Sequence, residues 1–384
     1  MRSPIAARSR EIPSSATVRI ADVVSDMRRR GIDVVDFSAG RAAEHTPAYV
    51  IEAAAQAMQR GDTHQTPAQG KPEFREACAR KLARDNGIEA DPKRELIATL
   101  GCKQGLFLGL QATLDPGDEV LVEDPGFVSY QPEIQYAGGR AVAVPLPWTA
   151  DALAEKLTSK TRGLVLCSPQ NPTGAVHRRE DLETIAGFAK EHDLLVYSDE
   201  TYERLTWDGH EHISIASLPA MRERTIALMG LTKSFSMGGW RVGFALAPAS
   251  ILEVMITVQQ HVVTCAGSFA QTGAVAAYGE PPREEVRALW ADWEKRCRRA
   301  AEALDAIPSV HCSMPEGAFY AWADIRALGE PSETLADRWL DELHVAVVPG
   351  SAFGPHGEGY VRITCVRSWE ELETGLSRLR SALC

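Results

Sequence analysis

A chain of 384 residues is too long for one ordinary hydrophobic core, so its length predicts two domains or three. Its net charge of -11 argues against general nucleic-acid binding, which needs a basic surface. The eight cysteines are scattered without a C-x-x-C pair, which argues against metal and disulfide frameworks and is typical of a reducing cytoplasm.

The N-terminal segment carries Arg2, Arg8 and Arg10 but lacks the apolar core of a signal peptide. No apolar run reaches the roughly 18 residues that a membrane helix needs. We therefore expect a cytoplasmic protein without a secretion signal or a membrane span.

The first 40 residues predict an arm, a helix that contains residues 20–30, and a short strand over residues 34–37. Thr46 followed by Pro47 predicts a helix cap and a first-turn proline, so the next helix is expected over residues 49–59. From residue 93 to residue 247, apolar strands alternate with helices. The expected strands are residues 96–99, 119–123, 164–167, 194–198, 225–229 and 242–246, and the expected helices are residues 103–114 and 179–192. Near-continuous apolar strands between helices are typical of a mostly parallel sheet in an α/β fold.

The tripeptide Glu280-Pro281-Pro282 interrupts a long helical region and predicts the hinge into a C-terminal domain. Residues beyond it mix helices and strands, as a smaller α+β domain does. The expected organisation is an N-terminal arm and part of the small domain over residues 1–40, a large domain over 41–280, and a C-terminal small domain over 281–384.

A strand-to-helix turn at residues 99–105 is the first candidate ligand site. Gly101 lets the backbone approach a ligand closely, and the free N–H groups at a helix start suit a phosphate. Cys102 and Lys103 belong to the same turn. An ordinary turn explains this segment equally well when the segment is considered alone.

Two further motifs follow predicted strands. Phe127, in residues 124–130, could stack on a planar ring, although a core aromatic is the commoner case. Asn171, in residues 168–174, offers donors for a carboxylate or a phenolate oxygen. It follows a strand, where open α/β sheets place ligands, although a turn rich in Asn, Pro and Gly is the simpler interpretation.

Asp199 ends another apolar strand, and Tyr202 follows it. A carboxylate here could keep a pyridine nitrogen protonated, because a nearby opposite charge shifts a pKa by about 1–3 units. A protonated pyridine ring is an electron sink for a carbanion, and Tyr202 could bond the oxygen of that ring. The competing interpretation is an acid that caps the next helix. Residues 210–212, His-Glu-His, lie in a polar turn, so no metal site is expected there.

Lys233 lies among small residues and is followed by two glycines and Arg241. An amine is nucleophilic only when it is neutral, which burial and a nearby cation favour. Arg241 could be that cation and could also hold a phosphate. The pattern suits a lysine that forms an imine with pyridoxal phosphate, which carries both an aldehyde and a phosphate. A surface lysine on a Gly-rich turn is the alternative for this segment alone.

Arg362 alternates with apolar neighbours on a probable strand over residues 359–364. A guanidinium group can bind a carboxylate through two parallel hydrogen bonds. A surface salt bridge is the commoner role for such an arginine.

In this order, the motifs resemble those of the fold-type I, class I/II pyridoxal phosphate-dependent aminotransferases, from about residue 15 to the C-terminus. Residues 115–120, 315–320 and 348–354 extend the resemblance. It implies a large domain with a mostly parallel seven-stranded sheet, a smaller α+β domain and a homodimer with shared active sites. The implied reaction is ping-pong transfer of an amino group between an L-amino acid and a 2-oxo acid.

The resemblance also implies a role for each matching residue. Lys233 would form the Schiff base and shuttle the proton, Phe127 would stack on the ring, and Arg362 would bind the substrate's α-carboxylate. The implied catalytic residues are Lys233, Asp199 and Tyr202. The implied cofactor contacts add Gly101, Cys102, Lys103, Phe127, Asn171 and Arg241, and the implied substrate contacts are Gly40, Asn171 and Arg362.

Three positions depart from the family pattern. Gln65 replaces a tyrosine that reaches the partner subunit's site in relatives, and Gly230 replaces a serine. Residues 41–44, Arg-Ala-Ala-Glu, replace Glu-Pro-Asp-Phe beside the expected substrate pocket. These changes motivate an alternative function, a pyridoxal phosphate-dependent lyase, cyclase or oxidase that uses the same carbanion.

Glu44, His45 and His64 are candidates for the neighbourhood of the substrate pocket, where an acid would suit a cationic amino acid. Solvated surface positions are the alternative for all three. A regulator with an N-terminal DNA-binding domain is disfavoured, because too few residues precede the first family motif. Small-molecule substrates are therefore expected, rather than nucleic acid or a membrane.

Overall fold

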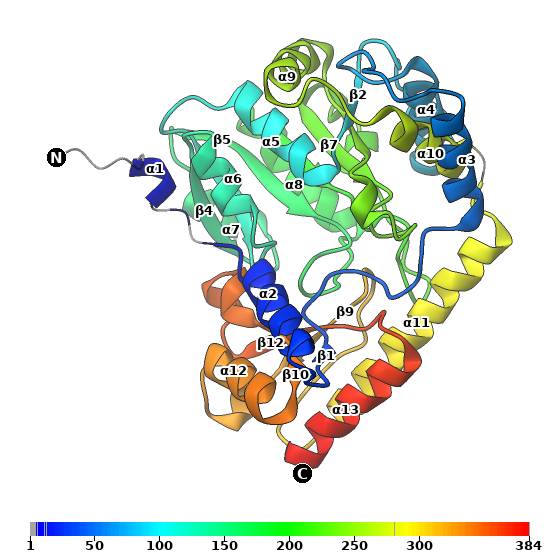
Figure 1. The fold of residues 1–384 in the computed structure, drawn as a ribbon. Coiled ribbons are helices and arrows are strands. Elements are labelled where there is room, and N and C mark those ends of the chain that lie inside the picture. Colours follow the sequence, from blue (N-terminus) through cyan, green and yellow to red (C-terminus); the bar gives the residue numbers. More distant parts are fainter. Residues whose placement is uncertain (1–4, 6, 11, 13, 280, 384) are drawn as a thin grey trace.

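The computed structural model describes the chain except residues 1–4, 6, 11, 13, 280 and 384. At its centre is a seven-stranded sheet (Figure 1). Its strands are β2 (Leu96–Thr99), β3 (Glu119–Asp124), β4 (Arg140–Pro145), β5 (Thr161–Cys167), β6 (Leu195–Asp199), β7 (Thr225–Gly230) and β8 (Gly243–Leu246). Their order is β2-β8-β7-β6-β5-β3-β4, and only β8 runs antiparallel to its neighbours in this sheet. The predicted α/β fold with a mostly parallel sheet is confirmed.

Helices cover this sheet on both faces. The helices of this part are α3 (Ala48–Gln59), α4 (Pro72–Asn86), α5 (Cys102–Thr113), α6 (Tyr130–Tyr136), α7 (Ala150–Lys156), α8 (Arg179–Glu191), α9 (Ala249–Val262) and α10 (Ser268–Tyr278). Successive residues of a strand point to opposite faces. In β3, Val120 and Val122 pack in the hydrophobic cluster that contains α5, whereas Leu121 packs in the cluster that contains α8. Burial on both faces is the reason why the inner strands are continuous apolar runs.

Strand β4 has no counterpart among the predicted strands. It lies at the end of the strand order, paired in parallel with β3. Its first four residues are exposed or half-buried. Its sequence, Arg-Ala-Val-Ala-Val-Pro, is nevertheless apolar after Arg140, so the run was present and the prediction omitted it.

The helix expected at residues 49–59 is α3, but its start differs from the prediction. Pro47 rather than Thr46 precedes the first helical residue, and no side chain caps the helix. The Thr46 hydroxyl instead donates to the Ser236 carbonyl at 3.0 Å and accepts from the Trp240 indole N–H at 3.0 Å. Long-range contacts therefore use the hydroxyl that the local pattern assigned to a cap.

A second lobe contains two small sheets. Its strands are β1 (Val35–Asp36), β9 (Tyr320–Asp324), β10 (Val345–Ala346), β11 (Val348–Pro349) and β12 (Tyr360–Thr364). Its helices are α2 (Ala16–Arg29), α11 (Glu284–Asp305), α12 (Ser332–Leu343) and α13 (Trp369–Leu383). β11, β12 and β9 form an antiparallel sheet, and β1 pairs in parallel with β10, so the N-terminal segment packs with the C-terminal part (Figure 1).

Two of the predicted features fall partly on residues that the structure does not describe. Arg2 of the predicted arm and Glu280 of the predicted hinge lie outside the described residues. α1 (Ala7–Arg10) belongs to the arm, and α10 and α11 lie on either side of residue 280. The domain boundaries at residues 40 and 280 stay predictions.

Short 3₁₀ helices connect several of the longer elements. They are η1 (Ile215–Ser217), η2 (Arg222–Arg224), η3 (Gly238–Trp240), η4 (Arg326–Leu328), η5 (Gly350–Phe353) and η6 (Pro355–Gly357). Among the described helices, none is long and apolar enough to cross a membrane.

Candidate active site

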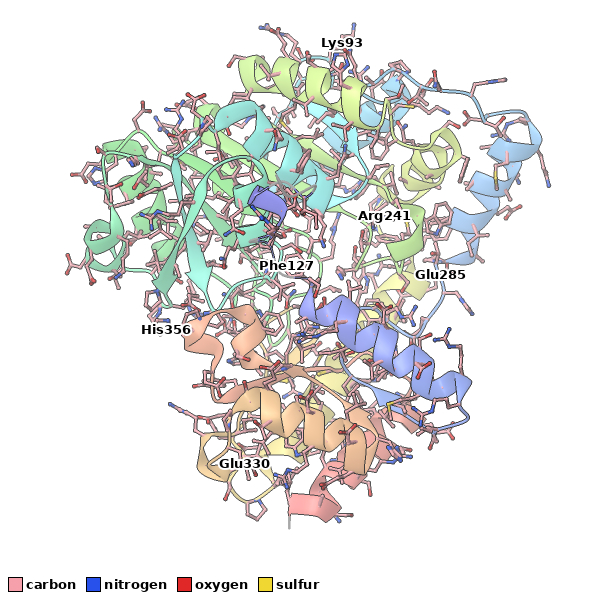
Figure 2. The ribbon with its side chains drawn as sticks, turned by 60° about the vertical axis from the view of Figure 1, so that its left-hand side comes forward. Lys93, Phe127, Arg241, Glu285, Glu330 and His356 are labelled. Carbon is pink, nitrogen blue, oxygen red and sulfur yellow. The ribbon has the colours of Figure 1, made fainter. Side chains whose placement is uncertain are left out.

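A cavity of about 370 Å³ lies where the carboxyl ends of the central strands meet the second lobe. Because the ends of parallel strands lie along one edge of a sheet, residues far apart in sequence converge there. Figure 2 shows Phe127 and Arg241 on the side of the large lobe that faces α2. The residues implied as catalytic, cofactor-binding or substrate-binding all line this cavity: Gly40, Gly101, Cys102, Lys103, Phe127, Asn171, Asp199, Tyr202, Lys233, Arg241 and Arg362.

One end of the cavity offers donors for an anion. Gly101 has φ +94° and precedes α5, so the amides of Cys102 and Lys103 lie in the first helical turn, where N–H groups have no helical partner. A Cβ at position 101 would be 3.2 Å from the Arg241 guanidinium. Arg241 is held by hydrogen bonds to the carbonyls of Gly238 at 3.0 Å and Leu100 at 2.6 Å. This arrangement fits a bound phosphate.

Cys102 takes up space that a side chain at position 230 would need. A Cβ on Gly230 would be 3.3 Å from the Cys102 Sγ atom. Burial raises the pKa of the Cys102 thiol, and the charge of Asp199 adds to that effect. The glycine that replaces the family's serine is therefore matched by a neutral sulfur packed beside it.

Asp199 lies at the end of β6 and is buried. Burial raises the pKa of its carboxyl to about 6, against the Tyr130 hydroxyl and the Thr201 amide, which donate hydrogen bonds to it at 2.9 and 3.2 Å. Tyr130 and Thr201 both line the cavity, but the sequence analysis did not select them as site residues. Tyr130 starts α6, three residues after Phe127. Its closeness in sequence to that candidate was the one signal that could have identified it as a site residue.

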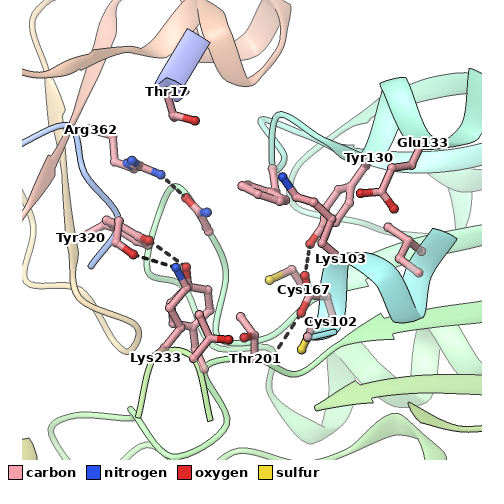
Figure 3. A pocket seen from close by; sticks show the side chains of 18 of the residues that line it. Thr17, Cys102, Lys103, Tyr130, Glu133, Cys167, Thr201, Lys233, Tyr320 and Arg362 are labelled. Atoms are coloured by element: carbon pink, nitrogen blue, oxygen red, sulfur yellow. Dashed lines mark hydrogen bonds between the residues drawn. The ribbon is translucent and has the colours of Figure 1, made fainter. Parts of the chain in front are cut away.

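Lys233 follows β7, and its ammonium group points into the cavity (Figure 3). Its Nζ donates a hydrogen bond to the Gly40 carbonyl at 2.7 Å. The same nitrogen lies 5.8 Å from the centre of the Tyr202 ring and 5.9 Å from that of Phe319. One hydrogen bond, to the Gly40 carbonyl, therefore holds the amine in place, and the rings of Tyr202 and Phe319 lie nearby.

Arg362 reaches the cavity from β12, the middle strand of the small antiparallel sheet. It is only 2% exposed, so the surface salt-bridge interpretation is wrong. Its two terminal nitrogens donate to the Asn171 side-chain oxygen and the Ser38 carbonyl, each at 2.9 Å. These bonds fix the orientation of the guanidinium plane at the cavity wall.

Lys103 extends its side chain along the cavity wall. Its Nζ lies 5.4 Å from the centre of the Phe127 ring, a cation–π distance. Burial lowers the pKa of Lys103, and the nearby carboxyl of Glu133 opposes that effect. The side chain is therefore part of the site, in addition to the backbone contact that the sequence implied.

Glu133 is an acid that the sequence analysis missed. It lies on α6 beside Tyr130 and Lys103, it lines the cavity, and it is 8% exposed (Figure 3). Among the described residues, neither of its carboxylate oxygens has a hydrogen-bond partner. Burial raises its pKa from 4.5 to about 8, and the nearby charge of Lys103 opposes that effect.

We expect Glu133→Gln to be more stable than the parent at pH 8.5 but nearly equal at pH 4. The folded pKa lies above the unfolded pKa, so the parent loses stability as pH rises from 4.5 through about 8. The amide has no proton to lose, and the difference at pH 8.5 should be about 2 to 5 kcal/mol. Urea unfolding of both proteins at several pH values measures it. The exposed Glu342→Gln is the control, and equal pH profiles for parent and Glu133→Gln would contradict the prediction.

Three acid or histidine candidates from the sequence lie elsewhere. Glu44 binds Arg296 at 2.7 Å and accepts from the Trp293 indole at 3.0 Å, and it does not line the cavity. His45 and His64 are exposed and do not line it either. None of the three therefore lines this cavity, and the ion pair with Arg296 of α11 holds the Glu44 carboxylate away from it.

The His-Glu-His turn does not act as one unit. His210 lies 3.8 Å from Glu316, whereas His212 is buried against Glu200 at 3.1 Å. In the described part of the chain, Glu200, Glu203 and His212 form a compact group, but the Lys81 ammonium contacts Glu203 there. The lysine already supplies the positive charge that a metal ion would bring.

Comparisons with known proteins give one consistent result. The family model for aminotransferase class I and II matches residues 32–379. An aspartate aminotransferase from Pyrococcus abyssi is 41% identical over 95% of this chain and 94% of its own length. An aromatic-amino-acid aminotransferase from Thermococcus litoralis is 40% identical over 92% of this chain and 93% of its own. The structure of Thermus thermophilus aspartate aminotransferase with maleate superposes with a TM-score of 0.93, at 37% identity over 100% of both chains.

Proposed function

This chain belongs to the class I and II aminotransferases, and from that premise we propose that Lys233 moves the proton in its transfer of an amino group between an L-amino acid and a 2-oxo acid. The enzyme is a pyridoxal phosphate-dependent transferase. The observation that carries the residue assignment is that Lys233, Asp199 and Arg362, from three separate strands or strand ends, line one cavity.

The cavity has the donors and acceptors that pyridoxal phosphate needs. The α5 amides and Arg241 would hold its phosphate, and the buried Asp199 would face its ring nitrogen. Tyr202 and Asn171 would bond its ring oxygen, and Phe127 would stack on the ring. When bound, the cofactor supplies an aldehyde that combines with amines and a ring that stabilises a carbanion.

The chain's own residues then bind the substrate and move its protons. Arg362 binds the α-carboxylate, with its plane fixed by Asn171 and Ser38. Lys233 Nζ, released from the Gly40 carbonyl, accepts the proton from the substrate's Cα and returns it later as a general acid. Both half-reactions use the same cavity in turn, so ping-pong kinetics follow.

We propose a dicarboxylic amino acid as the preferred donor. If Arg241 holds the phosphate and Arg362 the α-carboxylate, the Lys103 ammonium in the same cavity is left for a second carboxylate. The Pyrococcus relative, named an aspartate aminotransferase, supports this assignment. The Thermococcus relative is named for aromatic amino acids, which are therefore the alternative donors.

Steady-state kinetics with aspartate, phenylalanine and alanine as donors and 2-oxoglutarate as acceptor test this proposal. We expect the highest kcat/KM for aspartate, and Lys103→Met should lower that value by roughly tenfold or more while the alanine value changes little. A parent enzyme that prefers phenylalanine would replace the dicarboxylic assignment with the aromatic one. Turnover without any acceptor would contradict transamination itself.

We also propose a homodimer in which Gln65 approaches the partner subunit's site. Gln65 is exposed, and the next residue, Thr66, accepts a hydrogen bond from Gln271 of α10. Exposed apolar side chains on α3, α9 and α10 support an interface there: Ile51, Met58, Val254, Val262 and Phe269. A monomer mass in sedimentation would contradict the dimer. The free cysteines of the described part fit the predicted cytoplasmic location.

A further inference from the structure

Tyr320, the first residue of β9, touches both halves of the proposed site. It is 1% exposed and lines the cavity. Its hydroxyl oxygen lies 2.7 Å from the hydroxyl oxygen of Tyr202, and Figure 3 shows this contact beside Lys233. Its ring lies under the Arg362 guanidinium, 4.2 Å from the centroid. One side chain therefore contacts both the residue proposed for the cofactor's ring oxygen and the residue proposed for the substrate's carboxylate.

The hydroxyl pair has only one consistent proton arrangement when Tyr202 acts on the cofactor. Each phenol has a single proton to donate. If Tyr202 donates its proton to the ring oxygen, the hydrogen bond between the two tyrosines must be donated by Tyr320. Accepting that bond polarises Tyr202 and strengthens its own donation, as chains of hydrogen bonds do in a buried setting.

The glycine at position 40 makes room for this arrangement. A Cβ there would be 2.7 Å from the Tyr320 hydroxyl and 3.6 Å from Lys233 Nζ. The Gly40 backbone can therefore approach the tyrosine hydroxyl while its carbonyl holds the lysine. The Tyr320 hydroxyl is thus held between the Gly40 backbone and the Tyr202 hydroxyl.

The ring of Tyr320 has a second, separate effect. The two hydrogen bonds of Arg362 to Asn171 and Ser38 leave its Nε atom buried without a partner in the described part of the chain. The aromatic face holds the flat guanidinium through cation–π attraction, and Phe353 contributes a second ring at 5.0 Å. Loss of the Tyr320 ring would free that plane to tilt.

We propose that Tyr320 is a positioning residue with two separable functions: its hydroxyl directs the Tyr202 proton toward the cofactor's ring oxygen, and its ring orients Arg362 for the substrate's carboxylate. This inference rests on the proposed function.

Tyr320→Phe and Tyr320→Leu in the cofactor-loaded enzyme separate the two functions. In Tyr320→Phe, weaker donation by Tyr202 leaves more negative charge on the ring oxygen, which stabilises the protonated nitrogen of Lys233. The pH midpoint of the bound cofactor's absorbance change should rise by roughly 0.3 to 1 unit, with the KM for the amino acid changed less than about twofold. Tyr320→Leu should show the same spectral shift and a KM raised roughly fivefold or more.

Tyr278→Phe is the matched control, because Tyr278 is buried outside the cavity with a hydroxyl that has no partner in the described part of the chain. It should change neither readout. An unshifted spectral midpoint in Tyr320→Phe, when Tyr202→Phe does shift it, overturns the hydroxyl's function alone. An unshifted midpoint in Tyr202→Phe overturns the proposed role of Tyr202 and, with it, the function of the Tyr320 hydroxyl. An unchanged KM in Tyr320→Leu overturns the ring's function.

Discussion

We expect Lys233→Ala to lose turnover by at least roughly 10⁴-fold and to lack the absorbance of a lysine-bound cofactor. The alanine can neither combine with the aldehyde nor accept the proton from the substrate's Cα. The fold should survive, because within the described part of the chain Nζ donates one hydrogen bond, to the Gly40 carbonyl. Absorbance spectra and single-turnover kinetics of the purified, cofactor-loaded variant measure both effects.

The control for this substitution is Lys103→Met. Lys103 lines the same cavity, so its loss also removes a positive charge from the site. The Lys103→Met enzyme should keep the absorbance of the lysine-bound cofactor, because only the amine at position 233 is proposed to bind the aldehyde. If Lys233→Ala keeps its turnover, or if Lys103→Met loses the absorbance, the assignment of the reactive amine is wrong.

The candidate site was predictable from sequence because its chemistry lies at strand ends. Asn171 and Asp199 each follow a short apolar run, and such runs are recognisable without knowing their partners. In a parallel sheet the ends of these runs lie along one edge, so the fold brings them together. Arg362 was harder to place, because a strand arginine also suits the surface. Only its place in the series of family motifs favoured the site.

The residues that sequence reasoning missed act through other residues of the site. Tyr130 and Tyr320 have ordinary patterns of buried aromatics, and their hydroxyl contacts with Asp199 and Tyr202 span 69 and 118 positions of the chain. No local pattern encodes such a contact. Glu133 was missed for a related reason, since an acid on a short helix predicts a solvated face unless burial is known.

Long-range contacts also explain why two residues have other contacts than their local sequence patterns predict. Glu44 lies next to the expected pocket in sequence, but the pair with Arg296 of α11 turns it toward the second lobe. Thr46 has the sequence of a helix cap, but Ser236 and Trp240 use its hydroxyl. Local preferences are worth about 1 kcal/mol, so buried long-range contacts readily override them.

We expect Arg362→Lys to lower kcat/KM for the preferred amino acid by roughly 10² to 10³-fold, mainly through KM. Lysine keeps the charge but cannot form the planar, two-pronged contact with a carboxylate. The change also leaves the Asn171 oxygen and the Ser38 carbonyl without their present donor, in a buried place where an unpaired acceptor is costly. Steady-state kinetics with the best donor of the panel measure the effect.

A primary amine that lacks the α-carboxylate distinguishes lost recognition from general damage. Its slow half-reaction with the loaded enzyme should be changed less than about threefold by Arg362→Lys, because no carboxylate contact exists to lose. Arg367→Lys is the matched control, since Arg367 is also buried and hydrogen-bonded, to Glu371, but does not line the cavity. An equal loss with the amine and the amino acid would show that Arg362 supports the structure rather than the substrate's carboxylate.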